Sequence, residues 1–193
     1  IGGVENMVAL FSGTDVPFYH VSTAYVAGRR EGVCREDELE HDAGFNNTYE
    51  RSKNLSERIV RNAFEEGRVR GAIFRPAIIV GAAGDGLIAQ FMNFYNFIQV
   101  LEFALMRRRR GPSNFLLNAN PHCTKNLAAV DWTAQAMMRI IDGEGPSGHT
   151  YHLTNPNPPT HSFLVEWGNR ILAEAGMKIE FAGRGPAAGP TFK

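Results

Sequence analysis

The strongest constraint on the fold is a strand–helix–strand pattern within residues 16–81. Residues 16–22 are rich in aromatic and β-branched side chains and predict a buried strand; Pro17 falls at its start, where a missing N–H does least harm. An amphipathic helix is predicted over residues 47–67 and a second buried strand over residues 69–81. Two buried strands joined through a helix favour a parallel sheet with a right-handed crossover.

The predicted helix begins with a capping pattern, in which Asn47 is followed three residues later by Glu50. Its first turns carry Tyr49 and Lys53, and residues four apart lie on the same face of a helix. A fixed ammonium favours the charged form of a nearby phenol and so lowers its pKa, which makes the pair a candidate acid for carbonyl chemistry. A Tyr-x-x-x-Lys pattern also occurs as two unrelated polar residues on a solvated helix face, so the choice between this and a catalytic pair depends on the surrounding sequence. The expected buried stripe consists of Leu55, Ile59, Ala63 and Phe64.

Other elements are expected on both sides of this unit. They are a helix over 4–11, a Gly-rich loop over 81–86, an apolar helix over 87–106, a strand over 113–119, a helix over 131–141 capped by Asp131, a strand over 149–154, a helix capped by Thr160, and a strand over 177–181. The apolar helix is either buried between layers of the fold or forms the wall of a pocket for an acyl or other apolar substrate. Arg107 to Arg110 follow it, either as a solvated basic end or as a docking point for phosphate groups or an acidic carrier protein.

Composition narrows the class of protein. The 193 residues suffice for one ordinary domain, and 44% hydrophobic with 21% charged residues is typical of a soluble globular protein. A formal net charge of zero gives no indication of a nucleic-acid partner. Cys34 and Cys123 lie far apart, which predicts a reducing, cytoplasmic compartment and no metal motif. No apolar run predicts a membrane span.

Four blocks in order then resemble the extended short-chain dehydrogenase/reductase family. They are His-Val-Ser-Thr-Ala-Tyr-Val-Ala-Gly at 20–28, Tyr-Glu-Arg-Ser-Lys at 49–53, Arg-Pro-Ala-Ile-Ile-Val-Gly at 75–81 and Asn-Leu-Ala-Ala-Val-Asp-Trp at 126–132. The first three are most similar to the branch of thioester reductases and fatty acyl-CoA reductases. The resemblance covers roughly residues 1–175.

The resemblance implies roles for individual residues. Tyr49 resembles the proton donor, Lys53 the residue that lowers the pKa of that donor and holds the nicotinamide ribose, and Thr23 the hydroxyl that binds the substrate oxygen. The implied cofactor contacts are Ser22, Tyr49, Lys53, Pro76, Ala77, Ile78 and Val80. The expected substrate contacts are Ala24, Phe45, Phe91 and Tyr95.

The implied activity is an NAD(P)H-dependent reduction of a carbonyl, with NADP favoured and NAD possible. In the branch resembled, the substrate is an acyl thioester on CoA or a carrier protein, and the product is an aldehyde or alcohol. Two alternatives stay open: another activity of the extended family (a hydroxysteroid dehydrogenase or a sugar-nucleotide epimerase/dehydratase), and a non-catalytic binding module.

One departure from the family pattern concerns the nucleotide site. Family members begin with a strand and a Gly-x-x-Gly-x-x-Gly turn over the pyrophosphate, and residues 1–193 contain no such arrangement. The expected fold is therefore α/β: the C-terminal half of a Rossmann-like doubly wound parallel sheet, with a small, mostly helical substrate-binding region. Residues 1–86 would carry the catalytic residues, 87–182 the substrate-binding region interleaved with returning Rossmann elements, and 183–193 a flexible tail. An exposed sheet flank would favour oligomers.

Overall fold

The computed structural model describes residues 1–90, 94–106, 113–183 and 191–192. Its central sheet has the strand order β1-β3-β7, and all neighbouring strands are parallel. These strands are β1 (Phe18–Val21), β3 (Gly71–Pro76) and β7 (Thr150–Leu153). Phe18 pairs with Gly71, and Ile73 pairs with Thr150. The predicted parallel α/β sheet is thus confirmed.

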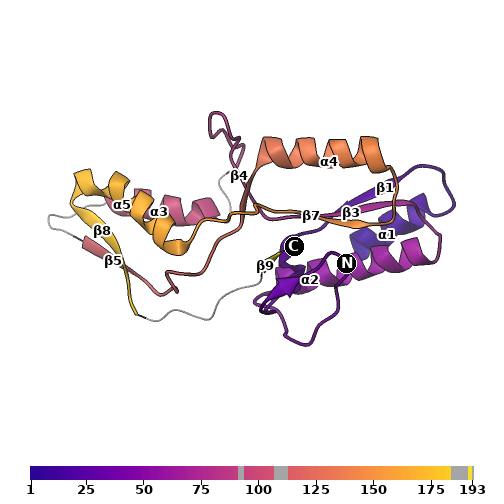
Figure 1. Cartoon of the computed structure of the whole chain (residues 1–193), viewed down its shortest axis with the longest axis horizontal. Coiled ribbons are helices and arrows are strands. Elements are labelled where there is room, and N and C mark those ends of the chain that lie inside the picture. The colour runs from indigo at the N-terminus through magenta and orange to yellow at the C-terminus, as the bar shows by residue number, and fades with distance from the viewer. Residues whose placement is uncertain (91–93, 107–112, 184–190, 193) are drawn as a thin grey trace.

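Helices cover both faces of this sheet (Figure 1). One face carries α1 (Gly2–Phe11) and α2 (Thr48–Glu65), and the other carries α4 (Val130–Glu144). The core under α1 and α2 consists of Val8, Val60, Ala63, Val69 and Ile73. Under α4 it consists of Ala72, Phe74 and Leu153, with half-buried side chains of α4 packed against them. Burial on both faces explains why β3 is buried at all six positions.

The second predicted strand is wrong in one respect, because residues 71–80 form two strands in different sheets. After β3 the chain bends at Ala77, whose N–H donates to the Leu153 carbonyl at 3.0 Å. Strand β4 (Ile78–Val80) then pairs in parallel with β6 (Leu127–Ala129). The change of partner is a tertiary effect that a continuous apolar run does not reveal.

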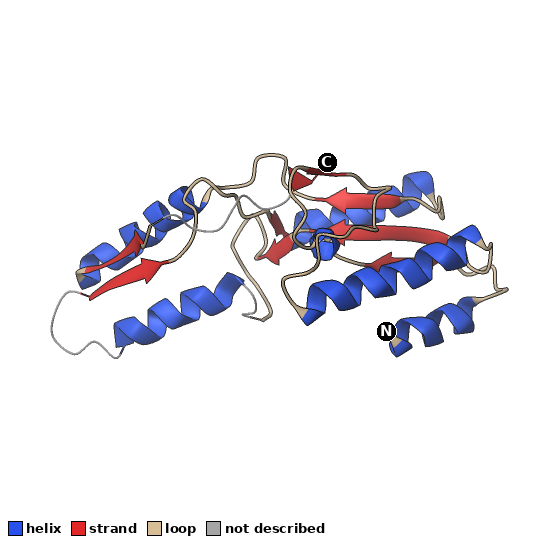
Figure 2. Cartoon of the chain, turned by 90° about the horizontal axis from the view of Figure 1, so that it is seen from below, coloured by secondary structure: helices blue, strands red, loops and turns tan. Residues whose placement is uncertain are grey.

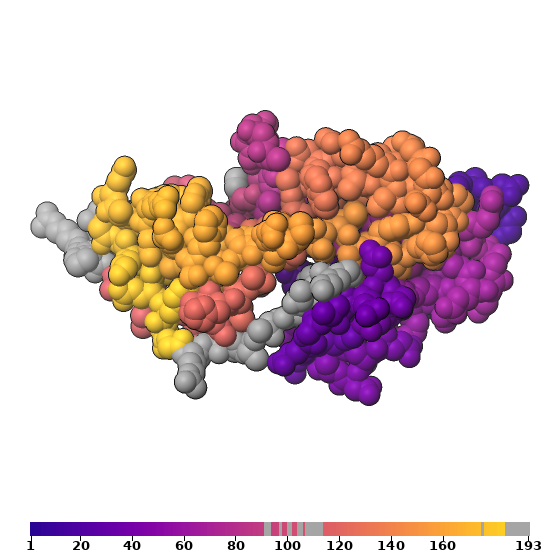
Figure 3. All heavy atoms as spheres, in the orientation of Figure 1, coloured from indigo at the N-terminus to yellow at the C-terminus, as the bar shows by residue number. Residues whose placement is uncertain are grey.

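A smaller lobe lies at the other end of the molecule (Figures 1 and 3). It contains α3 (Phe94–Met106), the parallel pair β5 (Ser113–Leu117) and β8 (Met177–Phe181), α5 (His161–Leu172) and the short helix η2 (Ala173–Ala175). Its core is Val165, Leu172, Met177 and Ile179, so one side of α5 packs on the two strands. Figure 2 shows these two strands between helices of the lobe.

Three remaining short elements complete the described chain: η1 (Ala24–Ala27), β2 (Val33–Cys34) and β9 (Thr191–Phe192), which pairs with β2. The predicted flexible tail falls largely on residues 184–190 and 193, outside the described residues. The predicted apolar helix was expected over residues 87–106, and the structure describes it as Phe94–Met106. Residues 87–90 are not helical. Asp131 is not the cap of α4, because Ala129 holds that position and Asp131 lies in the first turn.

Among the described residues, β1 has a strand on one edge only. Large apolar side chains are exposed near that edge and on α1, among them Leu10, Val16 and Val21. This arrangement fits the expected exposed sheet flank, and association through it stays a prediction. No helix in the described part of the chain is long and apolar enough to cross a membrane.

Candidate functional site

The start of α2 is fixed by local hydrogen bonds. Asn47 Oδ1 accepts from the Glu50 N–H at 2.9 Å, as the capping pattern predicts. The Glu50 carboxylate accepts from the N–H of Asn46 at 2.8 Å rather than from that of Asn47. Both bonds close the first turn, so Tyr49 and Lys53 have a defined position on the helix.

Thr23 and Lys53 both lie at the carboxyl edge of the sheet. Lys53 Nζ donates to the Val21 carbonyl, the last residue of β1, at 2.7 Å. The Thr23 hydroxyl is buried, donates to the Pro76 carbonyl at 3.4 Å and accepts from the Tyr25 N–H at 3.3 Å. Pro76 is the last residue of β3, so the two side chains lie where parallel strands end, which is where open α/β sheets bind ligands.

Tyr49 lies one turn before Lys53, on the same side of α2 by helical register. It is 58% exposed, and its hydroxyl makes no hydrogen bond with the described residues. A hydroxyl that is accessible and uncommitted beside an ammonium can donate to a ligand oxygen. Tyr49 and Lys53 thus lie on one side of α2, and Lys53 reaches the sheet edge at which the Thr23 hydroxyl donates to the Pro76 carbonyl.

The electrostatics of Lys53 depend on its neighbours on α2. Partial burial lowers the pKa of Lys53, and the Glu57 carboxylate one turn further along opposes this effect. Burial raises the pKa of Glu57, but the hydrogen bonds and charge of Arg75, with smaller contributions from Ser22 and Arg61, outweigh burial and hold that pKa below its usual value. Glu57 is thus an anion in the protein interior.

A buried ion network surrounds Glu57, and sequence reasoning missed it. Arg75 donates to Glu57 through Nε at 3.1 Å and through Nη2 at 2.7 Å, and both side chains are almost fully buried. Arg61 donates to Glu57 through Nε at 3.1 Å. The only sequence signal was the i,i+4 spacing of Glu57 and Arg61, which is more typical of a solvated helix face.

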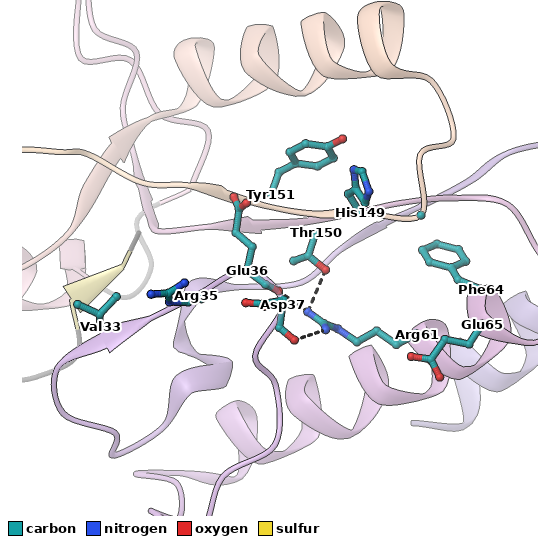
Figure 4. Close-up of a pocket in the computed structure, with 11 residues that line it drawn as sticks. Val33, Arg35, Glu36, Asp37, Arg61, Phe64, Glu65, His149, Thr150 and Tyr151 are labelled. Carbon is teal, nitrogen blue, oxygen red and sulfur yellow. Dashed lines mark hydrogen bonds between the residues drawn. The ribbon is translucent and has the colours of Figure 1, made fainter.

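The same two arginines fasten the loop ahead of α2. Arg75 donates to the carbonyls of Arg35 and Glu38 at 3.2 and 2.9 Å. Arg61 donates to the carbonyls of Glu36 and Asp37 at 2.6 and 2.9 Å. Arg61 also donates to the Thr150 hydroxyl at 3.0 Å, and Figure 4 shows it between the loop and β7. The network therefore joins α2, β3, β7 and this loop.

Two further polar residues are buried between β1 and α2. Burial, assisted by the Lys53 ammonium and opposed by Glu57, lowers the pKa of His20 to about 4, so its imidazole is neutral. Its Nε2 has no hydrogen-bond partner among the described residues. The Ser22 hydroxyl lies beside Glu57 and helps to lower the pKa of that residue, without a well-formed hydrogen bond. Ser22, predicted to contact the cofactor, is thus buried next to the ion network.

The segment predicted to lie along the nicotinamide spans the end of β3 and all of β4. Ala77 is buried, whereas Ile78 and Val80 are half-buried and line an apolar groove. Such side chains can offer a flat apolar surface to a ring. The Gly81 N–H donates to the Tyr95 hydroxyl at 2.8 Å, which ties the start of α3 to the end of β4.

The four predicted substrate contacts lie in different surroundings. Ala24 is 1% exposed, so its methyl group offers no surface in this structure. Phe45 is half-buried, with its ring centroid 5.1 Å from that of His41. Tyr95 lines the apolar groove. Phe91 lies outside the described residues.

Two cavities in the described part of the chain lie near the candidate site or the ion network. The apolar groove has a volume of about 1120 Å³ and lies between α3 and α5, beside β4 and β6. The other cavity has a volume of about 770 Å³ and lies at the amino end of β7, next to the ion network (Figure 4). Only the groove reaches the segment that follows Pro76. No cluster of three or more His, Cys, Asp or Glu side chains in the described residues could hold a metal ion.

Comparisons with solved structures establish the fold. The terminal R domain of the myxalamid PKS-NRPS biosynthetic pathway matches with a TM-score of 0.71 and 24% identity, over 93% of this chain and 43% of that domain. UDP-glucuronic acid 4-epimerase from Bacillus cereus, solved with NAD, matches with a TM-score of 0.68 and 14% identity, over 100% of this chain and 56% of the enzyme. RMD from Pseudomonas aeruginosa, solved with NADPH, matches with a TM-score of 0.68 and 16% identity, over 100% of this chain and 62% of that protein.

The chain thus spans about half the length of these structures. A comparison with curated protein sequences finds no match. The sequence profile described as male sterility protein matches residues 1–137, which is more than half of the chain. The predicted resemblance is confirmed, and the chain belongs to this NAD-binding family of male sterility proteins.

Proposed function

We propose that this protein supplies the catalytic half of an NAD(P)H-dependent reductase that transfers hydride to the carbonyl carbon of an acyl thioester. The observation that supports the proposal is that Thr23 and Lys53 contact the carboxyl ends of neighbouring strands, with the exposed phenol of Tyr49 one helical turn before Lys53. The apolar groove that begins at β4 supplies room for an acyl chain next to this edge.

The proposed chemistry follows from where charge develops. Hydride arriving at a carbonyl carbon leaves negative charge on the oxygen, so donors must already point at that oxygen. Tyr49 passes its proton to the oxygen, and the Thr23 hydroxyl donates to the same oxygen once it turns away from the Pro76 carbonyl. The Lys53 ammonium adds positive charge at the edge where negative charge develops. For a thioester, the adduct is a hemithioacetal, which collapses to an aldehyde and releases the thiol.

The dinucleotide, when bound, supplies the hydride, and the protein orients it. Lys53 would hold the nicotinamide ribose, and Ile78 and Val80 would lie along the ring. These residues fit such a group, because the Lys53 ammonium reaches the end of β1, and the half-buried apolar strand β4 begins two residues after Pro76, which the Thr23 hydroxyl contacts. We favour NADPH over NADH from the branch resembled.

The groove also bears on the alternatives. Its lining is dominated by aliphatic and aromatic side chains, which suits an acyl chain or a steroid better than a sugar nucleotide. A sugar-nucleotide epimerase/dehydratase, the activity named for one structural neighbour, is therefore the weaker second candidate. A non-catalytic module would need neither an accessible Tyr49 nor a groove that starts at the same edge.

A carrier protein or CoA is the proposed partner, since the thioester must be delivered by one of them. The predicted contact at Arg107 to Arg110 lies outside the described residues. Charge reversal of these four arginines should raise the apparent KM for a carrier-linked substrate and leave the KM for a small soluble thioester unchanged. Equal KM values for the carrier-linked substrate before and after reversal would remove this contact.

The test of the function uses the native polypeptide that contains these 193 residues. It is incubated with NADPH or NADH and with an acyl-CoA, a steroid ketone or a UDP-sugar, and the products are identified by mass spectrometry. Cofactor oxidation that depends on acyl-CoA, with formation of an aldehyde or alcohol, is the expected result. Turnover of the UDP-sugar or the steroid without turnover of the thioester would contradict the proposal.

A further inference from the structure

Helix α5 presents a stripe of large apolar side chains that the fold leaves uncovered. Phe163, Trp167 and Ile171 are spaced four residues apart, so they lie on one face of the helix. They are 58%, 57% and 56% exposed, and all three line the groove between α3 and α5. Contiguous exposed apolar surface of this kind marks a binding site.

The inner end of the groove adjoins the proposed catalytic edge. Ile78 lines the groove and lies two residues after Pro76, whose carbonyl accepts from the Thr23 hydroxyl. Tyr95 of α3 also lines this end and is tied to Gly81 by its hydroxyl. A molecule in the groove can therefore reach the reacting position with one end.

Charged side chains stand at the two ends of the apolar lining. Lys125 lines the inner end, because its neighbour Asn126 accepts from the Ile78 N–H at 3.2 Å. No carboxylate of the described residues forms an ion pair with Lys125. Glu102 lines the outer end, seven residues beyond Tyr95, which corresponds to about 10 Å along α3. This pattern suits an occupant with an oxygen atom at one end and an uncharged, apolar tail at the other.

The helical stripe limits the length of such an occupant. Phe163 and Ile171 are eight residues apart, which corresponds to about 12 Å along α5. An extended chain advances about 1.2 Å for each bond, since one residue has three backbone bonds and spans about 3.5 Å. The apolar stretch therefore accommodates roughly ten carbons.

We propose that the groove is an acyl-chain site that selects straight chains of up to about ten carbons, with the carbonyl end at Lys125 and the tail directed towards Glu102. The assignment rests on the proposed function, because it takes the occupant to be the acyl part of the substrate. Glu102 repels a carboxylate at the end of the tail, so chains that are acids at both ends are excluded. An amphipathic partner helix and a second copy of this chain are the competing occupants.

The chain offers its own reporter for a test that requires neither cofactor nor turnover. Trp167 lies in the groove, so the emission that Trp167→Phe removes from the native polypeptide containing these 193 residues is the signal of this reporter. The native polypeptide and this variant are titrated with N-acetylcysteamine thioesters of four to sixteen carbons, and the difference in emission is recorded. Each added methylene should tighten binding about two- to fourfold, and the gain should end near ten carbons.

Three further variants and one control test the direction and the length. Lys125→Met should weaken binding of every thioester at least fivefold without changing the gain per methylene. Ile171→Phe should move the limit to chains about two carbons shorter, whereas Met138→Phe, a substitution at an exposed site on α4, should leave the limit unchanged. Glu102→Gln should tighten binding of a thioester that ends in a carboxylate and leave the binding of its methyl-ended analogue unchanged.

Affinity that does not depend on chain length, or unchanged Trp167 emission, would overturn the inference. So would self-association at the titration concentration that Trp167→Ala abolishes, because the occupant would then be a second copy. Length-selective binding without any thioester reduction by the native polypeptide would refute the proposed function and leave this site intact. Reduction that is equally efficient for all chain lengths would refute the acyl-chain site and leave the proposed function intact.

Discussion

Removing the charge of Glu57 tests the buried ion network most sharply. Glu57→Gln keeps the shape of the side chain but leaves the Arg75 guanidinium, which is 1% exposed, without its counter-ion. Arg75 would retain the neutral amide oxygen of the new side chain, the carbonyls of Arg35 and Glu38 and the ring nitrogen of His152 as acceptors. These neutral groups cannot offset the cost of a buried positive charge.

Breaking one partner of a buried pair costs about 3–5 kcal/mol. That is a large part of the roughly 5–15 kcal/mol by which a domain is stable. Glu166→Gln serves as the matched control, because Glu166 pairs with Arg170 four residues on, as Glu57 also does with Arg61, but is 66% exposed. The control should cost less than about 1 kcal/mol.

Urea unfolding of the three proteins, followed by far-UV circular dichroism, measures the difference. Glu57→Gln should lower the midpoint strongly, and the control should leave it nearly unchanged. The double variant Glu57→Leu, Arg75→Met should recover most of the lost stability, because no unpaired charge remains. A loss for Glu57→Gln no larger than that of the control would refute the network as the anchor of this region.

Three further predictions follow from the same contacts. The folded-state pKa of His20 is about 4, below its usual value, so the unfolded chain binds a proton first as pH falls. The free energy of unfolding should therefore drop by about 3 kcal/mol between pH 6.5 and 4. His20→Phe should reduce this drop in urea titrations at successive pH values. Gly28→Ala should lower the melting temperature several-fold more than Gly67→Ala. Both glycines have a positive φ, but an added Cβ at Gly28 would lie 2.2 Å from the Gly44 carbonyl oxygen, whereas one at Gly67 would meet no atom within 4 Å. Equal shifts in melting temperature would contradict this explanation. Lys53→Met should lower kcat at least a hundredfold in the native polypeptide while its melting temperature changes little, and kcat within tenfold of the wild type would exclude its proposed role.

Local signals were sufficient for much of the fold. The cap at Asn47 and the cap at Thr160 both form, because each depends on residues within three positions. The strands around residues 18–21, 150–153 and 177–181 also appear where alternation and turn residues predicted them. These features are encoded in neighbouring side chains, and tertiary packing did not override them.

The sequence predictions were wrong or incomplete where residues distant in the sequence determine the surroundings of a side chain. Asp131 reads as a cap, but its carboxylate accepts from the Ala83 N–H at 3.0 Å, and this contact also helps to lower its pKa. The residues near Glu57 in the sequence predict a solvated charge, because its partner Arg75 lies eighteen positions away on the next strand. The predicted stripe on α2 likewise missed Asn54 and Ser56, which are both buried, and Asn54 donates to the distant carbonyls of Val26 and Leu39.

The candidate site was predicted from motif order, and the structure adds what spacing alone cannot provide. The Thr23 hydroxyl and the Lys53 ammonium reach the same edge through contacts with Pro76 and Val21. The groove depends on α5 returning beside α3 from more than fifty residues away, so no local pattern indicates it.

The central claim is that Tyr49 delivers the proton to the substrate oxygen at this edge. It is tested most directly by comparing kcat/KM for thioester reduction in the native polypeptide with and without Tyr49→Phe, at equal cofactor affinity and equal melting temperature. The account predicts a loss of about a hundredfold to ten-thousandfold, as is typical when a general acid is removed. A variant that retains more than about a tenth of the wild-type kcat/KM would contradict it, because such a loss is far smaller than general acid catalysis contributes.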